Sequence, residues 1–543
     1  MRGAKSAKWV VGAIVVAMAA TACGGGGSDD SGDKAEVNPD GTYTYYNTEP
    51  QKPLIPSNTN EVGGGYIVKN LFRSLVGFDE KNKLRMEAAE SIDTTDNQHF
   101  KVKLKPGWKF HNGEAQTSKS FVDAWNWAAN VKNAQLNASW FEPIKGYEDV
   151  HPKEGDPKTD KLEGLKVVND LEFTIDLKQP VATFKEQLFY DAFSPLPEAF
   201  FKDPKAFGQH PIGNGPYMMD GEWAHKVEFK TKKFPDYKGD DKPKNGGVIF
   251  KFYEKDTSAY SDLVSDKLDI MYQVPNSMAG QFQNDLGKRA VSDVYGGNTA
   301  IAFPLYDKEW SKPEKVKVRQ GLSMAVDRET IAKTALKGSK EAATGITPKI
   351  IEGYQDGACG EFCKFDPAKA KDLIKQGGGV PGNKLSVLYN ADGANKEWAD
   401  AVCNDIRQNA GIECVTDPKP TFQQARDLIT DRKLSGPFRM AWVQDFPNIQ
   451  NFISAQYRTK AGANDMEFSD KAIDELMNKA DAAKSIEESN KLYAEAEKKI
   501  IQEHMPSIPL FTDKTLAGYS KKVQNVKFDS FRQAIWTDVE VKK

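Results

Sequence analysis

Segments with two different hydrophobic periods alternate along this chain, and the alternation restricts the folds open to it. Apolar residues recur at every second position in 99–105 and 171–177, the pattern of half-buried strands. In 117–131 the period is that of a helix, with Phe121 and Trp125 on one face. Strand-like and helix-like segments follow one another to the C-terminus, so the sequence predicts a mixed α/β protein.

Signals at the expected helix ends support this assignment. In the segment 365–379, Asp366 stands at the expected N-cap and Gly377 at the expected stop. Further on, Ser485 and Glu488 have the spacing of a capping box before a long amphipathic stretch. Helices are therefore expected in both places.

Length and charge narrow the class further. A chain of 543 residues is too long for one ordinary domain, and its length predicts about three. With 39% hydrophobic and 28% charged residues the composition is that of a globular protein. The formal net charge of −3 provides no basic field for a phosphate backbone, so we expect no nucleic-acid partner.

The N-terminus has the pattern of an export signal, assigned to residues 1–22. Basic residues precede an apolar run of 12 residues, 9–20, which is shorter than the roughly 20 that span a bilayer. Cys23 and the glycine-rich tether 24–40 look like the processing site of a bacterial lipoprotein, although Ala20–Ala22 also suits ordinary signal cleavage. On the lipoprotein interpretation Cys23 carries the lipid, and the protein is extracytoplasmic, anchored to the outer face of the cell membrane.

The other cysteines form two local groups, as expected in an oxidising compartment. Cys359 and Cys363 are one group, and Cys403 and Cys414 are the other. Two local disulfides are the hypothesis, and a metal site built from all four thiolates is the alternative. The spacings fit common zinc patterns poorly, so we predict disulfides and no metal.

Motifs of catalysis and of cofactor binding are absent from the sequence. The six histidines are scattered, and there is no H-E-x-x-H pair, no G-x-S-x-G elbow and no phosphate-binding G-x-x-x-x-G-K-[ST] loop. Catalytic carboxylates have no local signature, so this search does not exclude an enzyme by itself. It gives no positive evidence for one, and we predict neither an enzyme nor a cofactor.

Five segments, taken in their order along the chain, resemble the family 5 extracytoplasmic solute-binding proteins of ATP-driven importers, which include the oligopeptide- and dipeptide-binding proteins. The resemblance extends over about 41–543. The segments that carry it are NLFRSLVGFDEKNKLRMEAAESI (70–92), FKVKLKPGWKFHNGEAQTSKSFVDAWNW (100–127), PIGNGPY (211–217), VRQGLSMAVDRETI (318–331) and AWVQDFPNIQNF (441–452).

The resemblance implies a two-lobed fold of the periplasmic-binding-protein type with three domains and a ligand cleft between the lobes. By analogy, domain I comprises 41–69, 210–298 and 513–543, domain II comprises 70–209, and domain III comprises 299–512. The ligand is expected between domains I and III, enclosed by a hinge motion.

The resemblance also assigns a role to the carboxylate in an otherwise apolar and amide-rich stretch. Trp442 to Phe446 is similar to the motif whose aspartate meets the α-ammonium of a peptide, and this aspartate is Asp445. An enclosed ammonium needs such a partner, because an unpaired buried charge costs several kcal/mol. The backbone of Ala441 to Val443 is expected to pair with the peptide as an added strand. The alternative for Asp445 is a turn-capping residue.

The resemblance also suggests residues that contact the rest of the ligand. Arg439 lies where some oligopeptide binders place an arginine for the ligand's C-terminus, and Arg432 or Arg426 would suit a longer ligand. Thr48 and Glu49 occupy the region that flanks the peptide in relatives.

These features together predict a monomeric substrate-binding lipoprotein that captures oligopeptides with a free N-terminus. It would deliver them to the transmembrane subunits of an ABC permease, which is driven by cytoplasmic ATPases. The same architecture with another cargo is the first alternative: an oligosaccharide, a nickel chelate, haem or an antibiotic. An extracellular peptidase is the second alternative, and a signalling receptor for peptides is the third.

Overall fold

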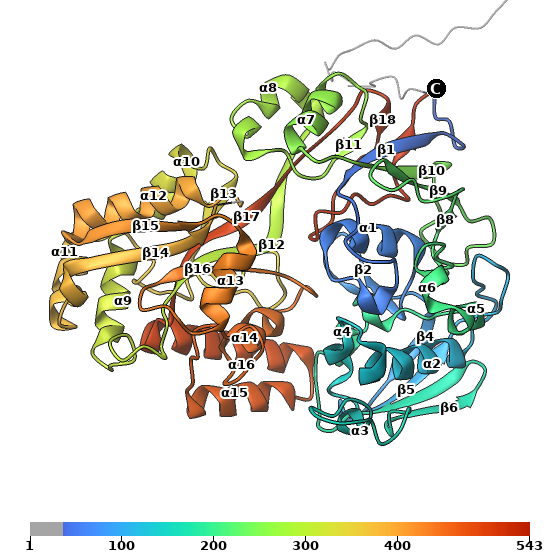
Figure 1. The fold of residues 1–543 in the computed structure, drawn as a ribbon, viewed down its shortest axis with the longest axis horizontal. Coiled ribbons are helices and arrows are strands. Elements are labelled where there is room, and N and C mark those ends of the chain that lie inside the picture. The colour runs from blue at the N-terminus through green and yellow to red at the C-terminus, as the bar shows by residue number, and fades with distance from the viewer. Residues whose placement is uncertain (1–35, 392) are drawn as a thin grey trace, which may run out of the picture. The chain divides into compact units, whose positions relative to one another are not determined.

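The computed structural model describes residues 36–391 and 393–543, so the expected signal sequence and Cys23 lie outside the described residues. Residues 37–543 form one compact unit. Strands and helices alternate through it, which confirms the mixed α/β class (Figure 1). Among the described residues no helix is long and apolar enough to cross a bilayer.

One long mixed sheet extends through most of this unit. Its middle strands β12 and β17 are antiparallel, and β1 and β10 form a parallel pair further along. Strand β13 (Lys340–Ala342) pairs with β17 off the main path. The order along the path is β15 (Glu413–Lys419), β14 (Lys384–Asn390), β16 (Phe438–Val443), β12 (Ala290–Ala302), β17 (Ser507–Tyr519), β11 (Ile270–Met271), β1 (Thr42–Asn47), β10 (Gly247–Phe252), β9 (Glu228–Lys233) and β8 (Tyr217–Met219).

Among the described residues, two large and separate hydrophobic cores lie along this sheet. One contains buried residues from 43–286 and 516–539, and the other contains buried residues from 300–511. The strands β12 and β17, 13 residues each, run antiparallel between the two cores (Figure 1). The chain thus passes from one lobe to the other twice. The division of the first lobe into domains I and II stays a prediction, because one continuous core covers both.

A smaller antiparallel sheet belongs to the first lobe. Its order is β4 (Ala89–Asp93), β5 (His99–Leu104), β7 (Glu172–Asp176) and β6 (Leu165–Asn169), and a hairpin of β2 (Val76–Phe78) and β3 (Leu84–Met86) precedes it. In β5, Phe100 and Val102 are buried while Lys101 and Lys103 are exposed, which confirms the period-two prediction. The predicted helix over 117–131 is α2 (Ser118–Ala129), with a capping box at its start.

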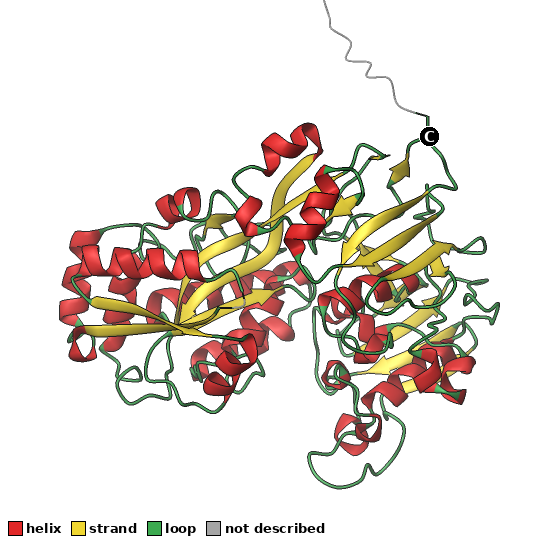
Figure 2. Cartoon of the chain, turned by 45° about the horizontal axis from the view of Figure 1, so that its top comes forward, coloured by secondary structure: helices red, strands yellow, loops and turns green. Residues whose placement is uncertain are grey.

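Helices lie on the faces of the sheet in the second lobe (Figure 2). The predicted N-caps hold there: Asp366 accepts from Lys369 N at 3.0 Å, and Ser485 accepts from Glu488 N at 3.2 Å. The helices of this lobe are α9 (Lys315–Met324), α10 (Arg328–Thr334), α11 (Pro367–Gln376), α12 (Lys396–Asp405), α13 (Phe422–Thr430), α14 (Ile449–Tyr457), α15 (Lys471–Asp481) and α16 (Ile486–Lys499).

Candidate functional site

Strand β16 ends close to the carboxylate that the sequence singles out. Asp445 follows the strand by two residues, and Asn448 then caps α14 by accepting from Gln450 N at 2.9 Å. The short connection between strand and helix therefore fixes the backbone on both sides of Asp445. Phe446 and Pro447 are buried beneath it, so the turn is packed on its inner side.

Asn451, in the first turn of α14, holds Asp445 at two points. Its Nδ2 donates to Asp445 Oδ2 at 2.9 Å, and its Oδ1 accepts from the backbone N–H of Asp445, also at 2.9 Å. The same Oδ1 accepts from Trp442 Nε1 at 3.1 Å. One buried amide thus orients both the carboxylate and the indole of the motif.

The charge of Asp445 is poorly compensated by the protein. Burial raises the pKa of Asp445 to about 6, and the hydrogen bond from Asn451 and the charge of Lys69 only partly oppose this. Lys69, on α1 (Val62–Leu71), makes its ion pair with Asp191 instead, at 2.8 Å. Within the described part of the chain no basic side chain forms an ion pair with Asp445.

A group of aromatic rings lies near this carboxylate. Trp140 stacks on Tyr190 with 3.9 Å between ring centroids, and it contacts Phe446 edge-on at 6.3 Å. Burial raises the pKa of Tyr190, and the charge of Asp445 raises it further, which places that ring close to the carboxylate. Asp445 is itself buried, so a charge there interacts strongly with any partner.

Strand β16 has one open edge next to Asp445. It pairs with β12 at each residue from Phe438 to Val443, but it pairs with β14 only at Phe438, opposite Leu388. Over 439–443 the described residues place no strand on that second side. Its backbone N–H and C=O groups on this edge have the geometry to accept an extended chain as an added strand.

A cavity of about 250 Å³ lies beside this open edge. Arg426 and Asp465 form a bidentate ion pair in its wall, and Trp442 and Arg439 approach it from β16. Its full lining is Leu388, Tyr389, Asn390, Phe422, Ala425, Arg426, Ile429, Arg439, Met440, Ala441, Trp442, Gln456, Gly462, Ala463 and Asp465. Mixed apolar and polar walls of this kind suit a side chain of moderate size.

A group of basic side chains gathers around Asp513 on β17. Lys340 forms an ion pair with it, and Arg532 lies at 3.8 Å. Burial alone would raise the pKa of Asp513, but these two cations, with a contribution from Arg439, hold it below its usual value. Two cations of the protein thus lie within ion-pair distance of one carboxylate on β17.

The structure brings together most of the site residues predicted from the sequence. Ala441, Trp442, Val443 and Asp445 lie on one strand end, with Phe446 packed behind. Arg439 lies on the same strand and lines the adjacent cavity.

The two residues predicted from the first strand have other described contacts. The carboxylate of Glu49 contacts His225 Nδ1 at 2.9 Å and accepts from the backbone N–H of Lys226 at 3.0 Å. Thr48 packs against Gly63. A Cβ atom at position 63 would lie only 2.6 Å from the carbonyl oxygen of Thr48. No described contact joins either residue to Asp445, so their role in ligand binding stays a prediction.

Reasoning from the sequence missed several residues of the site. Asn451 lies within the quoted motif, and its place six residues after Asp445, at a helix start, was the available signal. Lys69, Asp191 and Asp513 come from segments far apart in the sequence. No local pattern marks them.

The cysteines of the second lobe are paired as predicted. Cys359 is bonded to Cys363 and Cys403 to Cys414. This pairing replaces the alternative of a four-thiolate metal site. Among the described residues no cluster of histidine, cysteine and acidic side chains has the arrangement of a metal site.

Two lobes joined by paired strands, with a fixed carboxylate beside an open strand edge, define an α/β solute-binding protein. The family model for bacterial extracellular solute-binding proteins, family 5, matches residues 83–464. The chain belongs to this family, and it is a binding protein rather than an enzyme.

Individual relatives agree with the assignment. The oligopeptide-binding protein OppA of Bacillus subtilis is 24% identical over 516 residues, which cover 92% of each chain. The solved structure of the substrate-binding protein CtaP of Listeria monocytogenes matches with a TM-score of 0.79 at 19% identity, covering 93% of this chain and all of that one. Haemophilus influenzae OppA in complex with RPPGFSPFR matches with a TM-score of 0.74 at 20% identity, covering 94% and 100%.

Proposed function

We propose that this solute-binding protein captures oligopeptides with a free N-terminus and delivers them to an ABC permease. Asp445 is the proposed partner of the ligand's α-ammonium. The observation that carries this role is a buried carboxylate that is oriented by Asn451 and has no ion-pair partner among the described residues. A cationic ligand group supplies the missing partner.

The open edge of β16 supports a peptide as the ligand. Main-chain hydrogen bonds to Ala441 and Val443 would hold an extended peptide without recognising its side chains, which gives broad sequence tolerance. The cavity beside Trp442 and Arg439 would then accept one ligand side chain. Two of the similar proteins are named as oligopeptide-binding or were solved with a peptide, which favours the same cargo here.

The cations around Asp513 support a role for this part of the site at the ligand's other end. Lys340 and Arg532 both lie within ion-pair distance of Asp513, so an anion that reached them would be stabilised. The C-terminal carboxylate of a short peptide is such an anion. Arg439, on the peptide-pairing strand itself, is the proposed contact.

Membrane attachment and partners complete the proposal. Cys23 would carry the lipid that holds the protein at the outer face of the cell membrane, and the protein would act there as a monomer. Its partners would be the transmembrane subunits of the permease, with cytoplasmic ATPases.

The test is a thermal-shift titration of residues 24–543 with pooled tri- to pentapeptides and with the same pool N-acetylated. A ligand that binds only the folded state stabilises it by about 2.7 kcal/mol at 100 times its Kd. We expect a rise in Tm with the free pool only, and intact peptides by mass spectrometry after long incubation. No shift with either pool would refute the peptide proposal, and sugars or metal chelates would be tested next.

A further inference from the structure

A second cavity, of about 330 Å³, begins at Lys69 in the first lobe. On the Lys69 side its wall contains Phe189, Asp191 and Asp529. It continues between the β2–β3 hairpin and the C-terminal segment 533–538. Acidic side chains outnumber basic ones in its lining, so the first question is which of these acids the protein already neutralises.

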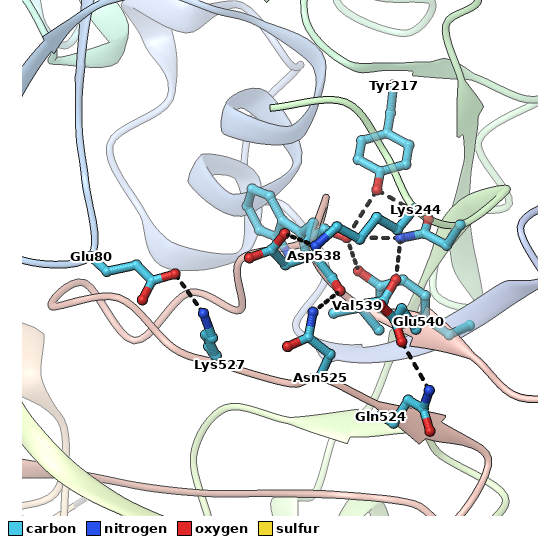
Figure 3. A network of polar contacts seen from close by, with 12 residues as sticks. Glu80, Tyr217, Lys244, Gln524, Asn525, Lys527, Asp538, Val539 and Glu540 are labelled. Carbon is cyan, nitrogen blue, oxygen red and sulfur yellow. Dashed lines mark hydrogen bonds and ion pairs between the residues drawn. The ribbon is translucent and has the colours of Figure 1, made fainter. Parts of the chain in front are cut away.

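Five of the seven acidic side chains in this lining form an ion pair with a lysine or arginine of the protein. Glu80 pairs with Lys527 at 2.8 Å and Asp538 pairs with Lys244 at 2.7 Å, as Figure 3 shows. The other pairs are Lys69–Asp191 at 2.8 Å, Arg73–Asp241 at 2.8 Å and Arg85–Glu87 at 2.6 Å. Asp79 is exposed at the hairpin turn, where its carboxylate caps Lys81 N and Lys83 N. Asp529 differs from all of these.

Asp529 presents an uncompensated carboxylate to the cavity. Its Oδ1 accepts from Phe531 N and Gln533 N, both at 2.9 Å, which fixes the side chain, while Oδ2 accepts no described hydrogen bond. Within the described ranges no basic side chain forms an ion pair with it. Burial raises the pKa of Asp529 to about 6, the two backbone hydrogen bonds oppose this, and Lys69 is the cation whose charge reaches it.

The neighbouring arginine does not serve Asp529. Arg532 lies over the ring of Tyr295 at 3.7 Å, donates to Gln273 Oε1 at 3.2 Å, and lies 3.8 Å from Asp513. The guanidinium of Arg532 therefore interacts with Tyr295, Gln273 and Asp513 and forms no ion pair with Asp529.

Asp529 and Asp445 belong to one electrostatic neighbourhood. The charges of both raise the pKa of Tyr295, although burial is the largest cause, and both carboxylates feel the charge of Lys69. Lys69 itself is paired with Asp191. The charge of one ammonium group thus acts on three carboxylates, those of Asp191, Asp445 and Asp529. A ligand with a single positive charge would leave one of these carboxylates uncompensated.

We propose that Asp529 is a specificity-determining residue that pairs with a second positive charge on the ligand, an ammonium or guanidinium side chain extending into the cavity beside Lys69. This inference rests on the proposed peptide function and narrows it to peptides that carry lysine or arginine near the free N-terminus. The cation replaces the water that a fixed, enclosed carboxylate otherwise needs.

The test measures by calorimetry how tightly a set of tripeptides binds to three proteins: the wild type, Asp529→Asn and Asp79→Asn. The peptides are trialanine variants with lysine or its uncharged analogue norleucine at each position in turn. The amide in Asp529→Asn can still accept both backbone hydrogen bonds, so that variant removes charge alone. Asp79 also accepts two backbone hydrogen bonds in the lining of the same cavity, which makes Asp79→Asn the matched control.

We expect at least tenfold tighter binding of the lysine peptide at one position in the wild type and in Asp79→Asn. In Asp529→Asn this preference should fall to about twofold or less, with norleucine peptides bound as before. Equal binding of lysine and norleucine peptides by the wild type would overturn the inference while the peptide function stands. So would a preference that survives Asp529→Asn.

A further arm uses 1,5-diaminopentane, which carries two ammonium groups and no peptide bond. If none of the tripeptides binds, the proposed peptide function fails. Binding of the diamine that Asp529→Asn abolishes would then still support the role of Asp529. Absence of that binding as well would end the inference.

Discussion

The side-chain amide of Asn451 binds Asp445 at two points, each at 2.9 Å: Nδ2 donates to the carboxylate, and Oδ1 accepts from the backbone N–H of Asp445. Asn451 so fixes the carboxylate next to the end of β16. A carboxylate held in this way has little rotational entropy left to lose when a cation arrives. Its orientation is set before the ligand binds, which favours tight binding without large rearrangement.

Replacing Asp445 with asparagine should weaken binding of peptides with a free amine by roughly 2 to 5 kcal/mol, because one partner of a buried charge pair is removed. Calorimetry with one tripeptide measures the loss. Asp431→Asn, an exposed site on the same lobe, is the control and should bind as the wild type does. Wild-type affinity in the Asp445 variant would show that the residue is only a turn residue.

Asn451→Ala should weaken the same peptide less than Asp445→Asn does. The charge stays, but the carboxylate and Trp442 lose their shared orienting amide. The variant should also raise the pKa of Asp445 above about 6, because the hydrogen bond from Asn451 lowers it. The check is the pH dependence of Kd: its acidic midpoint should move to higher pH, and an unmoved midpoint would contradict the orienting role.

Affinity for free-amine peptides should depend on pH through Asp445. The ligand needs the carboxylate ionised, so affinity should fall below about pH 6, by at most tenfold per pH unit for this one group. Above pH 6 it should stay level until the ligand's α-amine loses its proton near pH 8. Calorimetry at several pH values between 5 and 9 tests both limits, and a flat profile across pH 6 would exclude Asp445 as the ammonium partner.

The stability of the ligand-free protein should change in the opposite direction. Folding raises the pKa of Asp445 from 3.8 to about 6. The contribution of the protonated carboxyl to the free energy of unfolding is therefore fully present below pH 3.8 and is lost as the pH rises through about 6. Asp445→Asn should therefore be more stable than the wild type at pH 7, by unfolding in urea, and should lose that advantage near pH 4. A constant difference between the two proteins would contradict the raised pKa.

Removing the disulfide Cys403–Cys414 should lower the free energy of unfolding by about 2 to 4 kcal/mol, because the loop it closes gains freedom in the unfolded chain. The double variant Cys403→Ala, Cys414→Ala measures this in urea. Thiol titration of the unreduced wild type should find none of the four paired cysteines reactive. Four reactive thiols would show that neither bond forms.

The local parts of this fold were predictable from the sequence. The period-two pattern of β5 and the caps at Asp366 and Ser485 depend on neighbours within a few residues, and the structure has them as expected. Asp445 could be identified for the same reason, since its motif is contiguous. Asn451 was within reach of that motif, but a side chain that orients another leaves no distinctive pattern.

What the sequence by itself determined is the α/β class, the local cysteine pairs and the motif around Asp445, because each depends on spacing along one segment. Tertiary structure alone decided which charges meet. Lys69, Asp191 and Asp529 are separated by more than a hundred residues at each step, and the pairing of Lys69 with Asp191 leaves Asp445 and Asp529 without an ion-pair partner among the described residues. Electrostatic balance depends on distance in space and on exclusion of water, and folding sets both.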